Sequence, residues 1–298
     1  MRRRSVWLGI FVLSICVLAF CGSQLYQRAA APLAKQQGRV AVSLSALPGE
    51  LYDAKLLAAG ANPIVQKNGA LYEVIENAYR RLELPEEFTA IPELIAPSPD
   101  GGLWVVADQP KGQQILVKIS LQGTVLVQQE VVENRVQSIA CDVVGHVFLA
   151  TDGGEVWRYS PEGVFQGSVE LPCVEANLRL AVQKERVFVR ACSGNQRGRY
   201  LEILPELSVR EEGEGCLRGG EVCPIGSFLP EYALMEYDDV GLYACGSDGT
   251  WETVCLWEEL HLDGTLQGKL CSNFQGHGVV KYEKNGTAYV LTLYEARK

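Results

Sequence analysis

The sequence predicts an all-β fold, a β-propeller of four-stranded blades, behind an N-terminal membrane segment. Three observations predict it: strand-forming residues beside 30 glycines in a chain of 298 residues, hairpin turns that recur at the spacing of propeller blades, and a long uncharged apolar run near the N-terminus. Hydrophobic residues make up 47% of the chain and charged residues 21%. A chain of this composition can bury a large core, so a folded body is expected.

The first 22 residues have the pattern of a membrane-targeting segment. Arg2, Arg3 and Arg4 precede residues 5–22, a stretch without any charged side chain. At roughly 1.5 Å per residue this stretch is just long enough to cross the hydrocarbon core of a membrane. Because the positive flank stays on the cytoplasmic side, the rest of the chain is expected at the outer face of the cytoplasmic membrane, in the cell envelope.

Three fates of this segment stay open, and an uncleaved signal anchor is preferred. Cys21 lies in a stretch that resembles a lipoprotein cleavage box, so lipidation of Cys21 is one alternative, although Phe20 occupies a position that normally holds a small residue. Cleavage as a signal peptide near Ala30 is the other.

The predicted domains are the signal anchor or signal peptide at 1–22, a polar stalk at 23–67 and the propeller at 68–298. Within the stalk, residues 50–59 are predicted to form one short helix, with Gly60 beyond its end. The residues at helical spacing are Leu51, Ala54, Leu57 and Ala58.

One kind of hairpin turn precedes a strand with an aromatic residue. Examples are the turns that begin at Pro99 and at Asp142. The aromatic residues follow one another at about 40 to 55 residues, so we expect them in the blade cores, on equivalent strands of successive blades. They are Trp104, Phe148, Phe188, Tyr243 and Tyr289.

A second kind of turn follows about 15 to 21 residues after each of the first four aromatic residues, at 119–125, 159–165, 203–209 and 260–266. Glycine in such a turn supplies the positive φ that a tight hairpin needs. Leu207 replaces the glycine in the third copy, so that turn is expected to differ. Two hairpins in roughly 44 residues make one four-stranded blade.

Five blades are preferred. In this arrangement an outer hairpin at 70–84 joins a C-terminal inner hairpin around Tyr289 to complete the fifth blade and close the ring. Six blades become the count if residues 39–47 and 211–228 add strands.

The aspartate-glycine turns, together with the outer turn at Tyr159 to Gly163, resemble those of NHL-type and gluconolactonase-like bacterial β-propellers. They are also similar to propeller modules on some exported solute-binding lipoproteins, although no solute-binding domain is expected after the propeller here. The resemblance covers about residues 68–298 and implies that ligands bind near the central channel or on a loop face. It also implies, for lactonase-like members, a divalent cation held by acidic and amide side chains from several blades.

Candidate channel residues on the innermost strands are of mixed charge and contain no clear group of carboxylates. Oxygen ligands that converge would be needed for calcium or magnesium, so we expect no metal, no cofactor and no catalytic residue here. These candidates are Glu93, Ser138, Arg179, Glu236 and Lys281. His146 and His261 are expected in exposed loops and His277 in a flexible connection.

Eight of the ten cysteines follow the membrane segment, and an even number in an exported chain allows disulfides. A bond between Cys216 and Cys223 is the one pairing predicted, and the alternative is that the thiols stay free and buried. The chain has no C-x-x-C pair and only three histidines, which disfavours a structural zinc site.

A formal net charge of −9 disfavours nucleic-acid binding, because the surface repels phosphate. Without a reactive set of residues, the favoured function is a non-enzymatic extracytoplasmic propeller that binds a protein, peptide or carbohydrate partner. The alternative is a channel-centred metal-dependent hydrolase, of lactonase type, or a lyase. The oligomeric state stays open.

Overall fold

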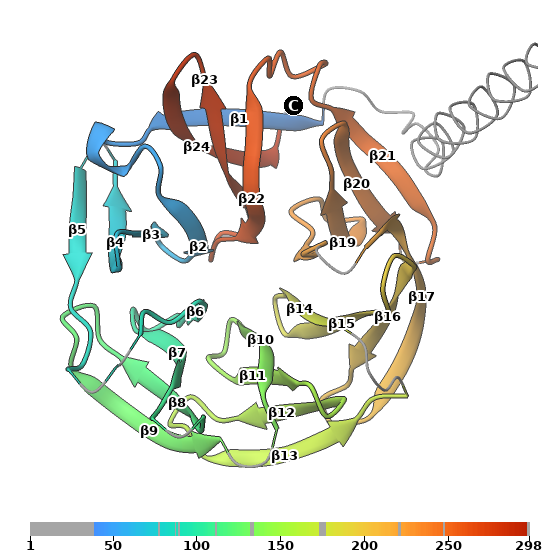
Figure 1. The fold of residues 1–298 in the computed structure, drawn as a ribbon. Coiled ribbons are helices and arrows are strands. Elements are labelled where there is room, and N and C mark those ends of the chain that lie inside the picture. The colour runs from blue at the N-terminus through green and yellow to red at the C-terminus, as the bar shows by residue number, and fades with distance from the viewer. Residues whose placement is uncertain are drawn as a thin grey trace, which may run out of the picture.

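The computed structural model is a ring of six four-stranded antiparallel sheets around a central channel (Figure 1). It describes residues 39–76, 78–86, 88, 90–110, 112–131, 134–172, 177–219, 222–246 and 248–296. The predicted membrane segment at 1–22, with Cys21, lies outside these residues. Within the ranges described, no helix is both long and apolar enough to cross a membrane.

The strands follow one another from the channel outward in each blade. Blade 1 is β2 (Lys55–Ala59), β3 (Pro63–Lys67), β4 (Ala70–Ile75) and β5 (Ala78–Leu82); blade 2 is β6 (Leu94–Pro97), β7 (Leu103–Asp108), β8 (Gln114–Ile119) and β9 (Val125–Val131); blade 3 is β10 (Val136–Cys141), β11 (Val147–Thr151), β12 (Glu155–Tyr159) and β13 (Phe165–Glu170). Blade 4 is β14 (Asn177–Gln183), β15 (Arg186–Cys192), β16 (Arg197–Ile203) and β17 (Val209–Arg218); blade 5 is β18 (Ile225–Gly226), β19 (Tyr232–Tyr237), β20 (Gly241–Gly246) and β21 (Trp251–Leu256); blade 6 is β22 (Thr265–Ser272), β23 (Gly278–Lys284), β24 (Thr287–Glu295) and β1 (Val40–Ala46).

The apolar cores lie between neighbouring blades, because strand side chains point alternately to the two faces of each sheet. On β2, Leu56 packs into the core shared with blade 6, while Leu57 packs into the core shared with blade 2. Middle strands such as β8 and β11 are therefore buried throughout, whereas the outermost β9 and β13 are mostly exposed.

The ring closes through its two terminal strands. β1 pairs with β24 from Val40 opposite Glu295 to Ala46 opposite Tyr289, so the N-terminal strand is the outermost strand of the last blade (Figure 1). The preferred count of five blades is wrong. The alternative of six is confirmed, because residues 39–47 supply β1 and residues 211–228 contain β18.

The recurring turns connect different pairs of strands in the early and the late blades. The aspartate-glycine turns join the first and second strands in blades 2 and 3, but the turns at 238–241 and 285–286 join the second and third strands of blades 5 and 6. Trp104, Phe148 and Phe188 therefore lie on second strands, while Tyr243 and Tyr289 lie on third strands. The expected equivalence of the five aromatic residues is wrong, because β18 has only two residues and leaves no periodic signal. The first four are buried as expected, and Tyr289 is half-buried.

The propeller begins at Val40, well before the expected boundary at residue 68. The helix predicted at 50–59 is wrong as well: Gly49–Leu51 forms one 3-10 turn, and β2 follows it. One face of β2 packs against blade 6 and the other against blade 2. This packing outweighs the weak helical spacing of its apolar residues.

The outer turn with Leu207 has the same hydrogen bonds as its glycine counterparts. Leu207 N donates to Leu204 O, and Leu207 holds a φ of 59°. Gly163 in the preceding blade makes the equivalent bond with a φ of 82°. The expectation that the third turn differs is therefore wrong, and Leu207 accepts the left-handed backbone that glycine adopts freely.

Candidate functional site: the central channel

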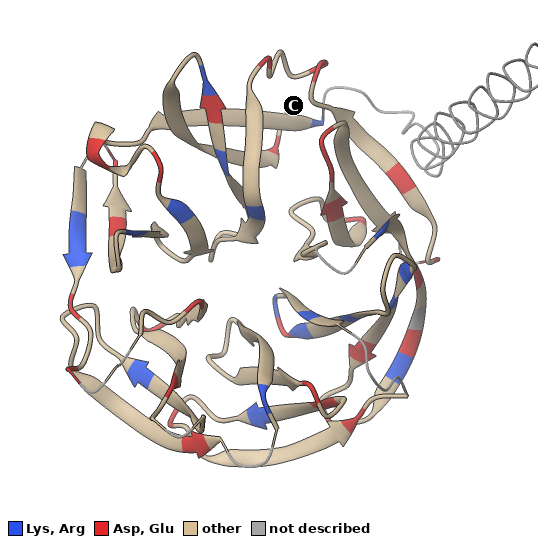
Figure 2. Cartoon of the chain, in the orientation of Figure 1, with Lys and Arg blue, Asp and Glu red and all other residues tan. Residues whose placement is uncertain are grey.

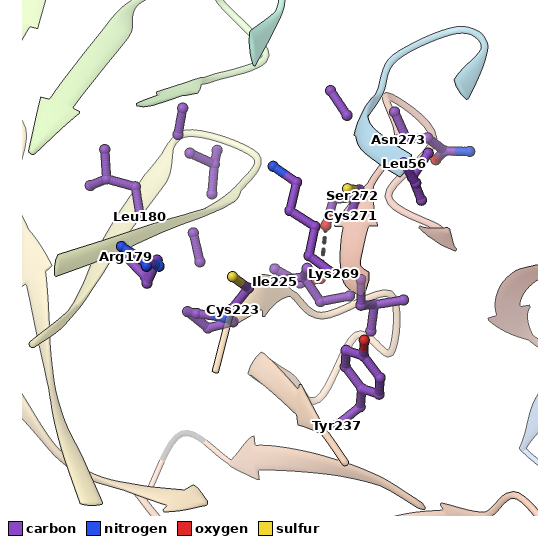
Figure 3. Close-up of a pocket in the computed structure, with 18 of the residues that line it drawn as sticks. Leu56, Arg179, Leu180, Cys223, Ile225, Tyr237, Lys269, Cys271, Ser272 and Asn273 are labelled. Atoms are coloured by element: carbon purple, nitrogen blue, oxygen red, sulfur yellow. Dashed lines mark hydrogen bonds between the residues drawn. The ribbon is translucent and has the colours of Figure 1, made fainter. Parts of the chain in front are cut away.

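The channel is a cavity of about 1280 Å³ lined by the first strand of every blade. These six strands lie at one edge of their sheets, so each is paired on one side only and its other edge faces the channel. Because β18 has only two residues, the cavity extends past it to Tyr237 on the second strand of blade 5 (Figure 3).

Three of the five predicted channel residues line this cavity. Glu93 lies at its rim and accepts a hydrogen bond from Lys55 Nζ at 3.1 Å. Ser138 Oγ accepts from Leu180 N at 3.0 Å, which links β10 to the neighbouring β14. Arg179 faces the cavity from β14 (Figure 3).

Glu236 and Lys281 are not in the channel. Both lie on second strands, β19 and β23, because of the shift by one strand. The Lys281 ammonium group lies 5.7 Å from the centre of the Tyr52 ring, and this lysine is 7% exposed.

Glu236 is part of a buried network between blades 4 and 5. Its Oε1 atom accepts from Arg190 Nε at 3.0 Å and from Tyr200 Oη at 2.7 Å, and its Oε2 atom accepts from Leu217 N at 2.7 Å. Arg190 also donates to the carbonyls of Leu217 and Gly219. Both ionic side chains are fully buried, so this network is structural and fixes the end of β17.

The sequence reasoning missed Lys269, which lies on β22 and lines the cavity opposite Arg179 (Figure 3). A repeated turn motif in the sequence could have identified this strand. Residues 273–277 repeat the hydrogen bonds of the turn at 142–146, with Asn273 in the place of Asp142. Recognising this turn would have identified β22 as a first strand. It also means that His277 lies in a tight turn and not in a flexible connection.

The carboxylates at the cavity are engaged in structural bonds. Asp142 Oδ1 accepts from the backbone N–H groups of its own turn, and its Oδ2 lies 2.9 Å from His146 Nδ1. His146 is consequently half-buried and not simply exposed, whereas His261 is exposed as expected. Asp238 Oδ1 caps the turn after β19 in the same way and accepts from Tyr243 Oη at 3.1 Å.

Cys216 is a free, buried thiol, so the predicted disulfide with Cys223 is not formed. The reason is the position of each residue: Cys216 lies on the outermost strand β17 and packs with Tyr200 and Trp251, while Cys223 lines the channel. Burial, followed by the nearby Glu236 charge, raises the pKa of Cys216 to about 12. Burial, with the Cys223 and Cys271 thiols nearby, raises the pKa of Tyr237 to about 12.

No group of three or more His, Cys, Asp or Glu side chains that could hold a metal ion occurs among the residues that the structure describes. The set of channel carboxylates that the family resemblance implied is therefore not assembled from those residues.

One end of the channel is bordered by apolar residues. Because strands alternate in direction through every blade, the turns between first and second strands all lie on the same face of the ring. We call the apolar residues at this end the turn mouth; they come from blades 2, 3, 5 and 6 and comprise Pro97, Val143, Phe228, Pro230 and Phe274. The Phe274 ring lies close to Gly60, and Phe274 and Val143 are 39% and 49% exposed.

Comparison with solved structures shows likeness to other β-propellers. An oxidoreductase from Thermus thermophilus, described as a glucose dehydrogenase, superposes with a TM-score of 0.56 at 13% identity, over 85% of this chain and 100% of that chain. A gluconolactonase from Xanthomonas campestris gives 0.50 at 12% identity, over 88% and 97%. The sequence matches no protein-family model and no curated protein. At these identities the likeness is one of fold, and the chain is a six-bladed β-propeller similar in structure to gluconolactonase and glucose dehydrogenase propellers.

Proposed function

We propose that this chain is a non-enzymatic β-propeller that binds a peptide segment of a partner protein at the turn mouth, on the outer face of the cytoplasmic membrane. The observation that carries the proposal is the turn mouth itself. Val143 and Phe274 are 49% and 39% exposed beside a cavity of about 1280 Å³. Exposed apolar residues around a concavity are typical of binding sites.

A peptide fits this site better than a carbohydrate. The first strands are sheet edges, and an extended peptide can use the N–H and C=O groups of such edges while its apolar side chains contact the surrounding residues. The placement at the cell envelope rests on the charged and apolar pattern of residues 1–22.

Nucleic acid is an unsuitable partner. The chain carries a net charge of −9, and acidic and basic residues are interspersed along the strands and turns of the ring (Figure 2). Phosphate binding of the usual kind needs clustered Lys and Arg.

The test is selection of peptides from a random displayed library on the purified full chain. We expect enriched peptides whose affinity falls about tenfold or more in the V143E and F274E variants, since central apolar anchors carry most interface energy. L126E is the matched control, because Leu126 is 54% exposed but lies on the outermost strand β9. Absence of enrichment, or equal loss in L126E, would contradict the proposal.

Elemental analysis of the full chain purified without chelator tests the alternative. A stoichiometric divalent metal would favour a metal-dependent hydrolase and call for a lactone-hydrolysis assay.

A further inference from the structure

We propose that the channel beside β18 also binds a small molecule with a carboxylate group and an apolar body, held by Arg179 and Lys269. This site lies inside the channel and uses none of the turn-mouth residues, so it stands independently of the peptide-binding proposal.

The first observation is a pair of cations that lack acidic partners. Within the described part of the chain, neither Arg179 nor Lys269 forms an ion pair, and the one hydrogen bond of the Arg179 side chain goes to the Leu178 carbonyl at 3.0 Å. Both side chains are half-buried and line the cavity on either side of Cys223 and Ile225 (Figure 3). A partly desolvated cation gains most from an anionic oxygen, because charge-assisted hydrogen bonds are the strong ones.

The second observation is that the cavity's carboxylates are already engaged. Glu93 pairs with Lys55, and Asp142 and Asp238 hold the backbone of their own turns. Asp239 has a partner of its own. The two cations are therefore left for a ligand.

The third observation is the apolar wall beside these cations. It is formed by side chains from blades 4 and 5 that line the same cavity: Leu180, Ile225 and Tyr237. A strongly hydrated ion such as phosphate would lose its water against this wall without replacement, whereas the apolar part of an organic carboxylate is stabilised by contact with it.

The test is calorimetric titration of the purified full chain with butyrate and benzoate, and with butyramide and inorganic phosphate as comparison ligands. We expect the carboxylates to bind about tenfold or more tightly than butyramide and more tightly than phosphate, because only they combine a charge with an apolar body. R179Q and K269Q should each weaken butyrate binding about fivefold or more. K55Q is the matched control, with an expected change below about twofold, because Lys55 lines the same cavity but pairs with Glu93.

Equal affinity for butyrate and butyramide, tighter binding of phosphate than of butyrate, or no measurable heat with any carboxylate would each overturn the proposal. Unchanged butyrate affinity in both R179Q and K269Q would also overturn it. Thermal unfolding followed by circular dichroism establishes that each variant is folded before titration.

Discussion

Arg190 and Glu236 show how single residues hold neighbouring blades together. Their side chains are fully buried, and a buried ion pair is tolerated only when every remaining donor and acceptor is bonded. Tyr200, Leu217 and Gly219 complete those bonds. Removing one partner leaves the other charge uncompensated in an apolar surrounding.

We predict that Glu236→Ala lowers the free energy of unfolding by about 3–5 kcal/mol. The matched control is Glu211→Ala, which removes the exposed pair with Arg199 and should cost below about 1 kcal/mol. Urea denaturation followed by fluorescence measures both. A similar decrease in the free energy of unfolding in the two variants would contradict the structural role of the Arg190–Glu236 network.

Gly163 provides a second test at the residue scale. It holds a φ of 82°, and a Cβ atom there would lie 2.3 Å from Val127 Cγ1 on the neighbouring blade. Gly163→Ala should therefore combine backbone strain of about 1 kcal/mol or more with overpacking of about 1–3 kcal/mol. Gly101→Ala, at a φ of 89° with no atom within 4 Å, should show the strain alone. Thermal unfolding measures both variants. An equal loss of stability in Gly163→Ala and Gly101→Ala would show that the contact with Val127 has no effect on stability.

Buried thiols make stability depend on pH. Burial raises the pKa of Cys141, Cys216 and Cys255 from 9.0 to about 12. Between these values the folded chain keeps protons that the unfolded chain loses. The stabilisation is thus fully present below about pH 9 and is lost as the pH rises towards 12. Urea denaturation at a series of pH values should show unfolding free energy declining only above about pH 9.

The same thiols should resist alkylation. At pH 8 a thiol of pKa about 12 has roughly a thousandfold less thiolate than an ordinary cysteine. Iodoacetamide should therefore modify the buried Cys216 and Cys255 only after unfolding, as peptide mass spectrometry would show. Rapid labelling of Cys216 and Cys255 in the native protein would refute their burial.

At the scale of elements, hairpins with glycine turns could be predicted from sequence because their signals are local. The turns that begin at Pro99 and at Asp142 join strands as predicted. β18 could not be predicted, since two residues carry no periodicity. β2 was missed because its side chains are buried by packing against blades 6 and 2, which its own residues do not reveal.

The residues of the candidate site could be predicted only where the strands that carry them could be predicted. Arg179 was predicted because the strand assignment of blade 4 was right, while Glu236 was misplaced and Lys269 missed because both follow the two-residue strand. Because β18 was not detected, the strands that follow it were assigned to wrong positions within their blades.

The closing strand β1 is predicted to stabilise the whole ring. A chain that starts at residue 47 loses the pairing with β24 and the burial of Val40, which is 6% exposed. Compared with a chain that starts at residue 38, we expect a loss on the order of 3 kcal/mol from hydrogen bonds and apolar burial. Urea denaturation measures the loss, and light scattering should detect association through the bared edge of β24. Equal stability of the two chains would show that β1 does not close the ring.

At the scale of the whole molecule, the six blades differ in the length of the first strand, which lines the channel. Five of the first strands have four to eight residues, while β18 has two. Blade 5 consequently contributes the least backbone pairing next to the channel, and local opening follows from few backbone hydrogen bonds. The ring should open first beside the proposed carboxylate site.

We therefore predict that backbone amides at 222–228 exchange with deuterium faster than those of the corresponding first strands β10 and β14. Hydrogen-exchange mass spectrometry on the native chain provides the measurement, with β10 and β14 as internal references of the same role. A carboxylate bound between Arg179 and Lys269 would bridge blades 4 and 6 across this segment and slow its exchange, because a ligand that binds the closed form opposes opening. Exchange at 222–228 as slow as in β10 would mean that the short strand is held as firmly as its longer counterparts, and that the channel is uniformly rigid.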